Sequence, residues 1–451
     1  MPDIKNNESI SFWSIFKFFL PLGATPFMIG LTHSIINAAL ARLQFPELSI
    51  AIFTVSKSLV AIVSMPTLLS LQLVLTFADN LKSFKKTFKF ILIMGATLLS
   101  ILLLIAYTPL GKWILVTFFE LTETRQLNFA YMALHIACFL PVVQLSRNTF
   151  QGLALSLKKT KMLLPGIFMR LLSISIFLWW VIRTGFLPGI VAGSLAWIVG
   201  IGIEGIFIFL ILRYNYGSIN NTIVKLPDKN HEPPTFTHLL HFFIPLGIMM
   251  SMTSLLQPVI QGNIARSSRP TISLAAYGVS WSIVALLTGP LTRLHQLSIV
   301  FLKEGDEDWS KIKLFSLSLG FAISAIVITT AITPLGNLVF QNIMGISAEL
   351  TEIARNVLLA FSLFPIICSL RESYWGLLMK QRTTSIIGAA KVSNLVTVFM
   401  VLIMGITYFH IQPAIMGGLA FTAGELMESL IIWRFISKKN IAVQFSSSGL
   451  N

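Results

Sequence analysis

The chain has 451 residues, of which 55% are hydrophobic and 11% are charged, and its formal net charge is +15. Soluble domains carry about 25% charged residues, so this composition excludes a soluble globular protein. Apolar runs of about 20 residues, long enough to cross a bilayer, recur along the chain. The sequence therefore predicts an all-α polytopic membrane protein. Its surplus of basic residues is expected to mark one side of the membrane rather than a nucleic-acid partner.

The predicted transmembrane helices follow one another closely. The first apolar run is too long for a signal-peptide core and no small-residue cleavage site follows it, so it is predicted to remain as a span. The twelve predicted spans are residues 14–41, 47–79, 87–108, 127–155, 162–182, 187–212, 237–265, 270–302, 312–333, 349–379, 383–409 and 412–436. Several are longer than the bilayer core requires, so we expect them to tilt or kink.

The segments outside the spans divide the chain into two bundles of six helices. Residues 214–236, "YNYGSINNTIVKLPDKNHEPPTF", are polar, contain Pro–Pro and show no helical apolar period, so they are predicted to be a cytoplasmic linker. The N-terminal bundle is then residues 14–213 and the C-terminal bundle is residues 237–437. Cytoplasmic tails are expected at residues 1–13 and 438–451.

Basic residues are distributed unevenly among the predicted loops. Lys and Arg concentrate in the N-terminal region, in the loops after even-numbered spans and in the C-terminal region, and Lys82, Lys85 and Lys86 are examples. Loops after odd-numbered spans carry far fewer. Cytoplasmic loops are enriched in Lys and Arg, so we expect both termini to lie on the cytoplasmic side of an inner or plasma membrane.

The two bundles repeat one another in sequence. The hexapeptide "FFLPLG" at 18–23 reappears as "FFIPLG" at 242–247, a shift of 224 residues. The same shift aligns Pro66 with Pro290, Arg147 with Arg371, Gly152 with Gly376 and Glu204 with Glu428. Because six is an even number of spans, both copies enter the membrane in the same orientation. Parallel repeats of this kind enclose a central cleft and suit alternating access.

Pro66 and Pro290 lie in the middle of the second span of each bundle. Proline removes a main-chain hydrogen bond and kinks a helix. Two interpretations stay open: a hinge that bends during transport, or a static kink of the kind common in membrane helices.

Four ionisable residues occupy matching positions within the spans of the two bundles, Arg147 with Glu204 and Arg371 with Glu428. An ionisable group at bilayer depth costs about 2.5–3.5 kcal/mol, so each needs a reason to be there. A pair that both bundles contain predicts one structural ion pair in each bundle. The alternative is a basic lining for the substrate.

Several basic groups within the spans break the symmetry of the repeat, as the walls of a site for an asymmetric substrate should. These candidates for the substrate cleft are Lys57, Arg170, Arg293 and Lys391. The other cleft candidates are the polar pairs His33 with Asn37 and Gln257 with Gln261, which match one another on the first and seventh spans. The polar residues have the i,i+4 spacing that places each pair on one helix face. The surplus of positive charge predicts an anionic substrate. Snorkelling to an interface, or an unrecognised acidic partner, is the alternative for each basic residue.

His295 and Glu372 are the candidates for proton coupling. Histidine can change charge within the physiological pH range, although a lone helix histidine is more often a neutral hydrogen-bonded group. Arg42 and Arg266 follow the polar pairs of the first and seventh spans. They are interpreted as headgroup anchors or as an outer basic rim.

The sequence contains no pattern that predicts an enzyme. There is no G-x-x-x-x-G-K-[ST] phosphate-binding loop, no catalytic triad and no metal-ligand cluster. Cys138 and Cys368 lie inside apolar runs and are predicted to be small buried side chains rather than a disulfide or metal site. We expect no catalytic residue, metal or cofactor. The expected partners are the bilayer, a small anionic or lipid-linked substrate and a coupling ion.

The twelve spans in two parallel repeats, with a linker after the sixth, resemble the multidrug/oligosaccharidyl-lipid/polysaccharide (MOP) exporter superfamily, which has the MATE fold. The segment "FFIPLGIMMSMTSLLQPVIQGNIAR" (242–266) is also similar to the seventh helix of the progressive ankylosis (ANKH-type) branch, through Pro245, Pro258 and Arg266. The superfamily resemblance implies secondary-active export or lipid flipping. The branch implies export of small anions such as pyrophosphate, citrate or nucleotides.

Three functional hypotheses follow. The first is a secondary-active exporter or flippase that moves a small anionic metabolite or lipid-phosphate headgroup by alternating access. The second is an H⁺- or Na⁺-coupled multidrug antiporter of the MATE type, which would use Glu204, Glu372 or Glu425; the first span lacks the acidic residue that many such antiporters carry there. The third, an enzyme acting on lipid phosphates, would need clustered catalytic groups near one interface, and the sequence shows none.

Overall fold

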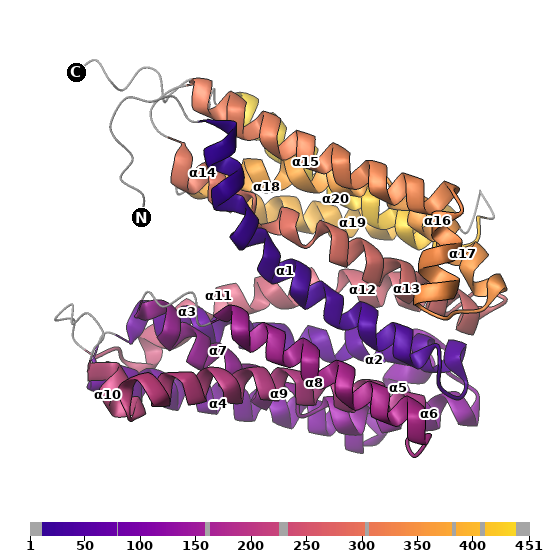
Figure 1. Cartoon of the computed structure of the whole chain (residues 1–451), viewed down its shortest axis with the longest axis horizontal. Helices are drawn as coiled ribbons and strands as arrows, with labels where there is room; N and C mark the ends of the chain where they lie inside the picture. The colour runs from indigo at the N-terminus through magenta and orange to yellow at the C-terminus, as the bar shows by residue number, and fades with distance from the viewer. Residues whose placement is uncertain are drawn as a thin grey trace. The chain divides into compact units, whose positions relative to one another are not determined.

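The computed structural model describes residues 11–78, 80–157, 163–224, 233–302, 306–380, 385–405 and 411–438. All regular structure in these ranges is helical. The helices, labelled in Figure 1, are α1 (Phe12–Leu40), α2 (Pro46–Ser64), α3 (Leu69–Phe77), α4 (Leu81–Tyr107), α5 (Pro109–Phe119), α6 (Thr124–Ala137), α7 (Leu140–Ser156), α8 (Leu163–Thr184), α9 (Gly189–Tyr216), α10 (Ile219–Val224), α11 (Phe236–Ser254), α12 (Leu256–Ile264), α13 (Pro270–Thr288), α14 (His295–Phe301), α15 (Asp306–Ile332), α16 (Leu335–Asn337), α17 (Ala348–Ala360), α18 (Phe364–Lys380), α19 (Ser385–Met404) and α20 (Pro413–Lys438).

Eleven helical segments within the described ranges are long and apolar enough to cross a membrane, and they coincide with eleven of the predicted spans. The other predicted span, residues 237–265, contains α11 and α12, and its apolar stretch Phe236–Ile248 is shorter. Large apolar side chains such as Leu92, Ile176 and Trp179 are exposed, which suits a surface that faces lipid. The prediction of an all-α polytopic membrane protein is confirmed.

Both predicted proline kinks are present. The second span divides into α2 and α3 around a 3-10 turn, Met65–Leu68, that contains Pro66. At the matching place in the second half, the 3-10 turn Pro290–Arg293 separates α13 from α14. Proline cannot donate the hydrogen bond that a continuous α-helix needs, and a short 3-10 turn continues the chain past it. A hinge role for these breaks stays a prediction.

The described helices group into two compact units. The larger unit consists of Thr32–Val279 and Gln341–Leu350, and the smaller unit consists of the described parts of Met1–Leu31, Ser280–Phe340 and Thr351–Asn451. Helices α1 and α13 each pass from one unit to the other, so this division differs from that of the repeat. The bundles 14–213 and 237–437 stay a prediction, as does the linker, of which residues 225–232 lie outside the described residues. Most of both predicted tails, residues 1–10 and 439–451, lies outside them as well.

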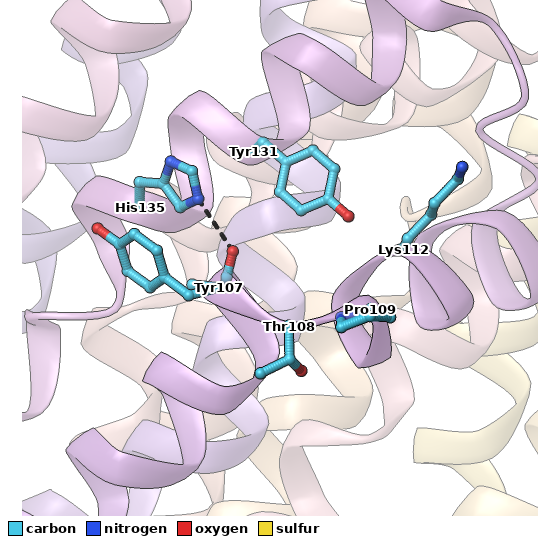
Figure 2. Close-up of a pocket in the computed structure, with 7 residues that line it drawn as sticks. Tyr107, Thr108, Pro109, Lys112, Tyr131 and His135 are labelled. Carbon is cyan, nitrogen blue, oxygen red and sulfur yellow. Dashed lines mark hydrogen bonds between the residues drawn. The ribbon is translucent and has the colours of Figure 1, made fainter.

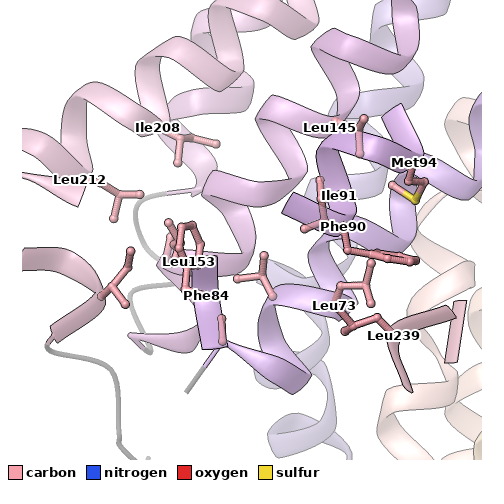
Figure 3. Packing of buried hydrophobic residues seen from close by; sticks show 14 residues of the cluster. Leu73, Phe84, Phe90, Ile91, Met94, Leu145, Leu153, Ile208, Leu212 and Leu239 are labelled. Atoms are coloured by element: carbon pink, nitrogen blue, oxygen red, sulfur yellow. The ribbon is translucent and has the colours of Figure 1, made fainter. Parts of the chain in front are cut away.

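In the larger unit, α7 and α8 both pack against α9, and α3 and α4 pack against α7. A buried apolar cluster joins α3, α4, α7, α9 and α11, as Figure 3 shows. Its labelled residues are Leu73, Phe84, Phe90, Ile91, Met94, Leu145, Leu153, Ile208, Leu212 and Leu239. Within a membrane, such contacts hold helices together through close packing rather than through removal of apolar surface from water.

In the smaller unit, α14, α15 and α20 pack against α18, and α19 packs against α20. Four aromatic rings from this unit, those of Trp281, Phe361, Phe364 and Phe421, lie with neighbouring centroids 4.7–6.3 Å apart. In the repeat, Trp281 occupies the position that Lys57 occupies in the first half. The same repeat position is therefore a packed aromatic ring, Trp281, in the smaller unit and a charged group, Lys57, in the larger unit.

Candidate functional site

The first charged cluster lies in the larger unit around Glu204 of α9. Its buried carboxylate lies 3.6 Å from Arg147 Nη1 of α7 and 3.4 Å from Arg170 Nη1 of α8. Gln151 donates a hydrogen bond of 2.8 Å to the other carboxylate oxygen. A buried carboxylate is tolerated only when it is paired and hydrogen-bonded, and these three groups supply that. The predicted pair of Arg147 with Glu204 is therefore present, and Arg170, predicted as a cleft residue, joins it.

Two glycines of α9 let the neighbouring helices approach Glu204. At Gly205, a Cβ atom would lie 3.2–3.3 Å from the main chain and Cβ of Arg147. At Gly200, a Cβ atom would overlap the side chain of Ile174 and lie 3.4 Å from Arg170 Cγ. Small residues at helix interfaces allow close approach in membrane proteins. These glycines thus bring both arginines within reach of one carboxylate.

Arg147 also connects the cluster to the helix break at Pro66. Its Nη2 donates to Asn148 Oδ1 at 2.7 Å, and Asn148 Nδ2 donates to the carbonyl of Thr67 at 3.0 Å. The Thr67 hydroxyl donates in turn to Gln144 Oε1 at 2.7 Å. The 3-10 turn is therefore tied to α7 by two side-chain hydrogen bonds, one of which leads directly to the charged cluster.

Lys57 and His33 lie beside this cluster. Lys57 is partly buried on α2, with its ammonium group 5.9 Å from the centroid of the Phe53 ring, and none of the ion pairs found among the described residues includes it. Lys57 and Arg170 are close enough to act electrostatically on the His33 ring, whose buried Nδ1 has no hydrogen-bond partner in the described part of the chain. Counting Lys57 and the two arginines, the region holds three cations and one carboxylate.

The predicted polar stripe is only partly brought together. Gln261 accepts a hydrogen bond of 2.5 Å from Ser58 of α2 and donates to Gln257 at 3.5 Å. Asn37 instead donates to the carbonyl of Gly278 at 3.4 Å. Tyr277 of α13 donates to Gln257 at 3.2 Å. Gln261 therefore bonds to α2, whereas Gln257 and Asn37 both bond to α13.

The second charged cluster lies in the smaller unit among α18, α19 and α20. Arg371 of α18 forms ion pairs with Glu425 of α20 and, at 2.7 Å, with the adjacent Glu372. Lys391 of α19 lies 2.8 Å from Glu428 Oε2 and 3.8 Å from Glu425 Oε1. Three carboxylates therefore share two cations in direct contact, which is the opposite balance from the first cluster.

The predicted pairing of Arg371 with Glu428 needs correction, because Arg371 bonds to the two other carboxylates. Glu428 is held by Lys391 instead. Asn394 donates hydrogen bonds of 2.8 Å to Glu428 and 2.9 Å to Glu425. The physical reason is that the second half contains two carboxylates that the first half lacks, and they take the guanidinium.

The proton-coupling candidates His295 and Glu372 are hydrogen-bonded to each other, with His295 Nδ1 2.9 Å from Glu372 Oε2. The other oxygen of Glu372 accepts from Arg371, and Arg293 is close enough to act electrostatically on this carboxylate. His295 begins α14, directly after the 3-10 turn that contains Pro290. This hydrogen bond therefore ties the second cluster to the second helix break.

Sequence reasoning does not single out Gln151 and Asn394, and it names Glu425 only for the alternative function. Gln151 lies four residues after Arg147, on the same helix face, and that spacing is a signal that identifies it. Asn394 stands at the repeat position of Arg170. The Asn394 amide is a hydrogen-bond donor like the Arg170 guanidinium, but it carries no charge. The alignment of the two halves could have identified Asn394 as a carboxylate partner.

Arg42 and Arg266 both bond to main-chain carbonyls, and their roles as headgroup anchors or as an outer basic rim stay predictions. Arg42 donates to the carbonyl of Ile343 at 2.5 Å. At the matching position, Arg266 donates to the carbonyl of Thr117 at 3.1 Å and pairs with Glu120 at 3.2 Å. Both sets of contacts lie within the larger unit. Each joins one half of the sequence to the other near the predicted outer ends of the spans.

We expect the double variant Arg42→Ala/Arg266→Ala to open this outer connection. A hydrogen bond from a charged donor contributes about 1.5–3 kcal/mol, and a change of about 1.4 kcal/mol shifts an equilibrium tenfold. The measurement is the electron-spin distance between labels at Thr122 and Ser347 in a cysteine-free background, which should lengthen or broaden. Arg183→Ala, at the end of α8, is the control. An unchanged distance in the double variant would show that these arginine bonds do not hold the two segments together.

Cys138 and Cys368 are free and buried, as predicted. Within the described residues, no group of three or more His, Cys, Asp and Glu side chains is arranged to hold a metal ion. The carboxylates of the two clusters are bonded to arginine, lysine and amide groups instead.

The fold matches those of known transporters over nearly the whole chain. An inward-facing multidrug resistance MATE family transporter of the MOP superfamily aligns with a TM-score of 0.71 at 11% identity, covering 93% of this chain and 96% of that one. The lipid II flippase MurJ, in an inward closed conformation, aligns with a TM-score of 0.66 at 14% identity, covering 94% and 90%. A MOP superfamily transporter from Pyrococcus furiosus, described as having a binding pocket of reverse polarity, aligns with a TM-score of 0.63 at 13% identity, covering 97% and 99%. The chain therefore has the predicted MATE-like fold.

The family model of the progressive ankylosis protein (ANKH) matches residues 3–176 and 228–446. The matched ranges include Arg147 and Arg170 of the first cluster, Lys57 beside it, and the whole of the second cluster. This match confirms the resemblance carried by residues 242–266. The chain belongs to the progressive ankylosis protein family.

Proposed function

We propose that this protein is a secondary-active transporter that exports a small anionic metabolite or flips a lipid-phosphate headgroup by alternating access. The observation that carries the proposal is the surplus of positive charge around Glu204, where three basic side chains share one carboxylate. Two positive charges are left without a carboxylate among the described residues of this region. An anionic substrate would supply the missing negative charge.

The size of the electrostatic effect favours an anion over a cation. Two unit charges 4 Å apart attract by about 4 kcal/mol at an effective dielectric constant of about 20. An anion beside Lys57 and Arg170 would gain from both, whereas a cation would be repelled by both. Glu204 offers a cation little compensation, because it already pairs with two arginines.

The fold supports transport without selecting a substrate. Proteins of this fold include a multidrug transporter and a lipid II flippase, so the same helices serve unlike cargoes. The Pyrococcus furiosus transporter is described as having a pocket of reverse polarity. A pocket of reverse polarity is therefore compatible with this fold, which supports a cationic site around Glu204.

In this proposal the second cluster couples transport to protons. Its three carboxylates share two cations in direct contact, with Arg293 acting on Glu372 from further away, so an added proton lowers the negative charge that these cations balance. His295 and Glu372 face each other at 2.9 Å and can hold that proton between them. Because His295 follows the break at Pro290, a change of protonation would act directly on the proposed hinge.

In this proposal both termini lie in the cytoplasm, as the distribution of basic residues predicts. Pro66 and Pro290 act as hinges of the two halves, and the protein is a transporter without enzymatic activity.

A cation-coupled multidrug antiporter is the alternative, and the carboxylates of the second cluster are the observation that favours it. Glu372, Glu425 and Glu428 are buried and would attract a cation. Each is bonded to Arg371 or Lys391, however, so a cationic drug would have to displace a fixed cation. The anion proposal needs no such exchange.

Proteoliposomes containing the purified protein test the proposal. We expect transport of labelled pyrophosphate, citrate or a lipid-linked sugar, and none of a cationic dye. Lys57→Ala should reduce the anion flux about tenfold or more, because a charge-assisted contact contributes at least about 1.4 kcal/mol. Lys17→Ala, an exposed lysine of α1, is the matched control. Dye transport, or equal anion flux in Lys57→Ala and wild type, would reject the assignment.

A further inference from the structure

A pocket of about 450 Å³ lies in the larger unit at the turn between α4 and α5, as Figure 2 shows. Its polar side chains are those of Tyr107, Thr108, Lys112, Tyr131 and His135. None of these residues belongs to either charged cluster. The pocket therefore needs an explanation apart from the transport site.

The turn that forms the pocket has a counterpart in the second half of the chain. A Cβ atom at Gly111 would overlap the carbonyl oxygen of Ile105, and a Cβ atom at Gly336 would overlap that of Thr330. Both turns begin with the same tetrapeptide, "TPLG". The main chain thus makes the same tight turn twice, so the side chains around the two turns can be compared position by position.

In the second half the corresponding space is occupied by Arg355. Its Nε donates to the carbonyl of Ala331 at 2.8 Å, and its Nη1 donates to Asn337 Oδ1 at 3.0 Å. Atoms of the Arg355 side chain would lie 2.9–3.0 Å from a Cβ atom at Gly336. This turn is therefore closed by a guanidinium group from the protein itself.

In the first half Tyr131 stands at the position of that arginine at the shift of 224 residues. Lys112 stands at the position of the asparagine at the shift of 225 that aligns the two copies of "TPLG". His135 Nε2 lies 2.9 Å from the carbonyl of Ala106, and the His135 ring stacks on Tyr107 with centroids 4.3 Å apart. Figure 2 shows the Tyr131 hydroxyl directed toward the helix that carries Lys112. The pocket thus stays open and presents an ammonium and a hydroxyl, with no carboxylate among its lining residues.

We propose that this pocket binds the phosphate of an anionic lipid headgroup. Helix α4 is one of the membrane spans and ends at Tyr107, so the pocket lies where a span reaches the interface, and Tyr and Lys are suited to that level. An ammonium group and a phenol hydroxyl are both donors to phosphate oxygens. On the proposed topology, the lipid belongs to the outer leaflet.

Native mass spectrometry of the full chain released from nanodiscs of equal phosphatidylglycerol and phosphatidylcholine tests this proposal. Wild type should retain phosphatidylglycerol about tenfold more than phosphatidylcholine, as expected for one charge-assisted contact of about 1.4 kcal/mol. Lys112→Asn should remove most of that preference. The triple variant Lys112→Asn/Tyr131→Arg/His135→Leu imports the residues of the second half and should close the pocket.

Lys89→Asn, in the N-terminal third of α4 and away from the pocket, is the matched control and should leave the preference unchanged. Excess inorganic phosphate distinguishes a lipid site from a site for free phosphate: retention of phosphatidylglycerol in its presence supports the lipid assignment, and displacement overturns it. Equal preference in wild type and Lys112→Asn also overturns the proposal, and this single variant decides the question if the triple variant does not fold.

Discussion

Glu204→Ala is expected to lower the free energy of unfolding by about 3–5 kcal/mol, the range found when one partner of a buried ion pair is removed. The carboxylate is buried and lies 3.6 Å from Arg147 and 3.4 Å from Arg170. Without it, two guanidinium groups would remain near each other in a region where the described residues provide no other carboxylate partner for them. Like charges repel strongly where water is excluded, so the packing of α7 and α8 against α9 should loosen.

Glu428→Ala provides the matched control for this prediction. Lys391 also lies 3.8 Å from Glu425, and Arg371 pairs with Glu372 and Glu425, so each cation keeps a carboxylate when Glu428 is removed. We expect a smaller loss, about 1–3 kcal/mol, from the hydrogen bonds that disappear. Reversible unfolding in mixed detergent micelles measures both variants. Equal losses would contradict the difference in charge balance between the two clusters.

Much of the fold could be predicted from the sequence, because its signals are local. The lengths of the apolar runs set the spans, and the helix breaks lie at Pro66 and Pro290, because proline lacks the main-chain donor that a helix needs. Proline alone does not decide a break, since α1 continues through Pro21 and Pro26. The two compact units were harder to predict from the sequence. Whether the first and last parts of α1 pack with the same neighbours depends on contacts between distant helices, and no local pattern of residues encodes them.

The repeat alone did not predict the site, because it matches Arg147 and Glu204 with Arg371 and Glu428 and only the first of these pairs forms an ion pair. Arg147 and Glu204 meet because α7 packs closely against α9. Arg371 could not be assigned in the same way, since three carboxylates lie within reach of its side chain and the choice among them depends on the geometry of α18 and α20. The bond from Arg42 to the carbonyl of Ile343 was inaccessible for another reason: main-chain acceptors have no sequence signature.

The two clusters have a feature in common that their charges do not reveal. Each is linked by a side-chain hydrogen bond to the helix break of its own half, through Asn148 and the carbonyl of Thr67 in the first half and through Glu372 and His295 in the second. In the first half the link is an amide, which cannot change its charge. In the second half both partners can take up or release a proton. The asymmetry therefore places the proton-sensitive connection at Pro290 and the fixed connection at Pro66.

Glu372→Gln is expected to abolish proton-driven accumulation of the anion while leaving its downhill exchange in place. Glutamine has nearly the same shape as glutamate and can still bond to Arg371 and His295, so the helix contacts should persist. It cannot bind a proton in the relevant pH range. A pH difference of one unit supplies about 1.4 kcal/mol per proton, which supports about tenfold accumulation in wild type and none in the variant.

The measurement compares labelled-anion uptake into proteoliposomes with and without an imposed pH gradient. Glu349→Gln is the control, because Glu349 is an exposed carboxylate of α17 that pairs with Arg269; it should accumulate substrate as wild type does. If accumulation survives in Glu372→Gln, the coupling proton binds to another group. If the variant loses both accumulation and downhill exchange, Glu372 instead supports the packing of α14 on α18. Only the separate loss of accumulation follows from a proton held between His295 and Glu372, because only that role requires the carboxylate to change its charge.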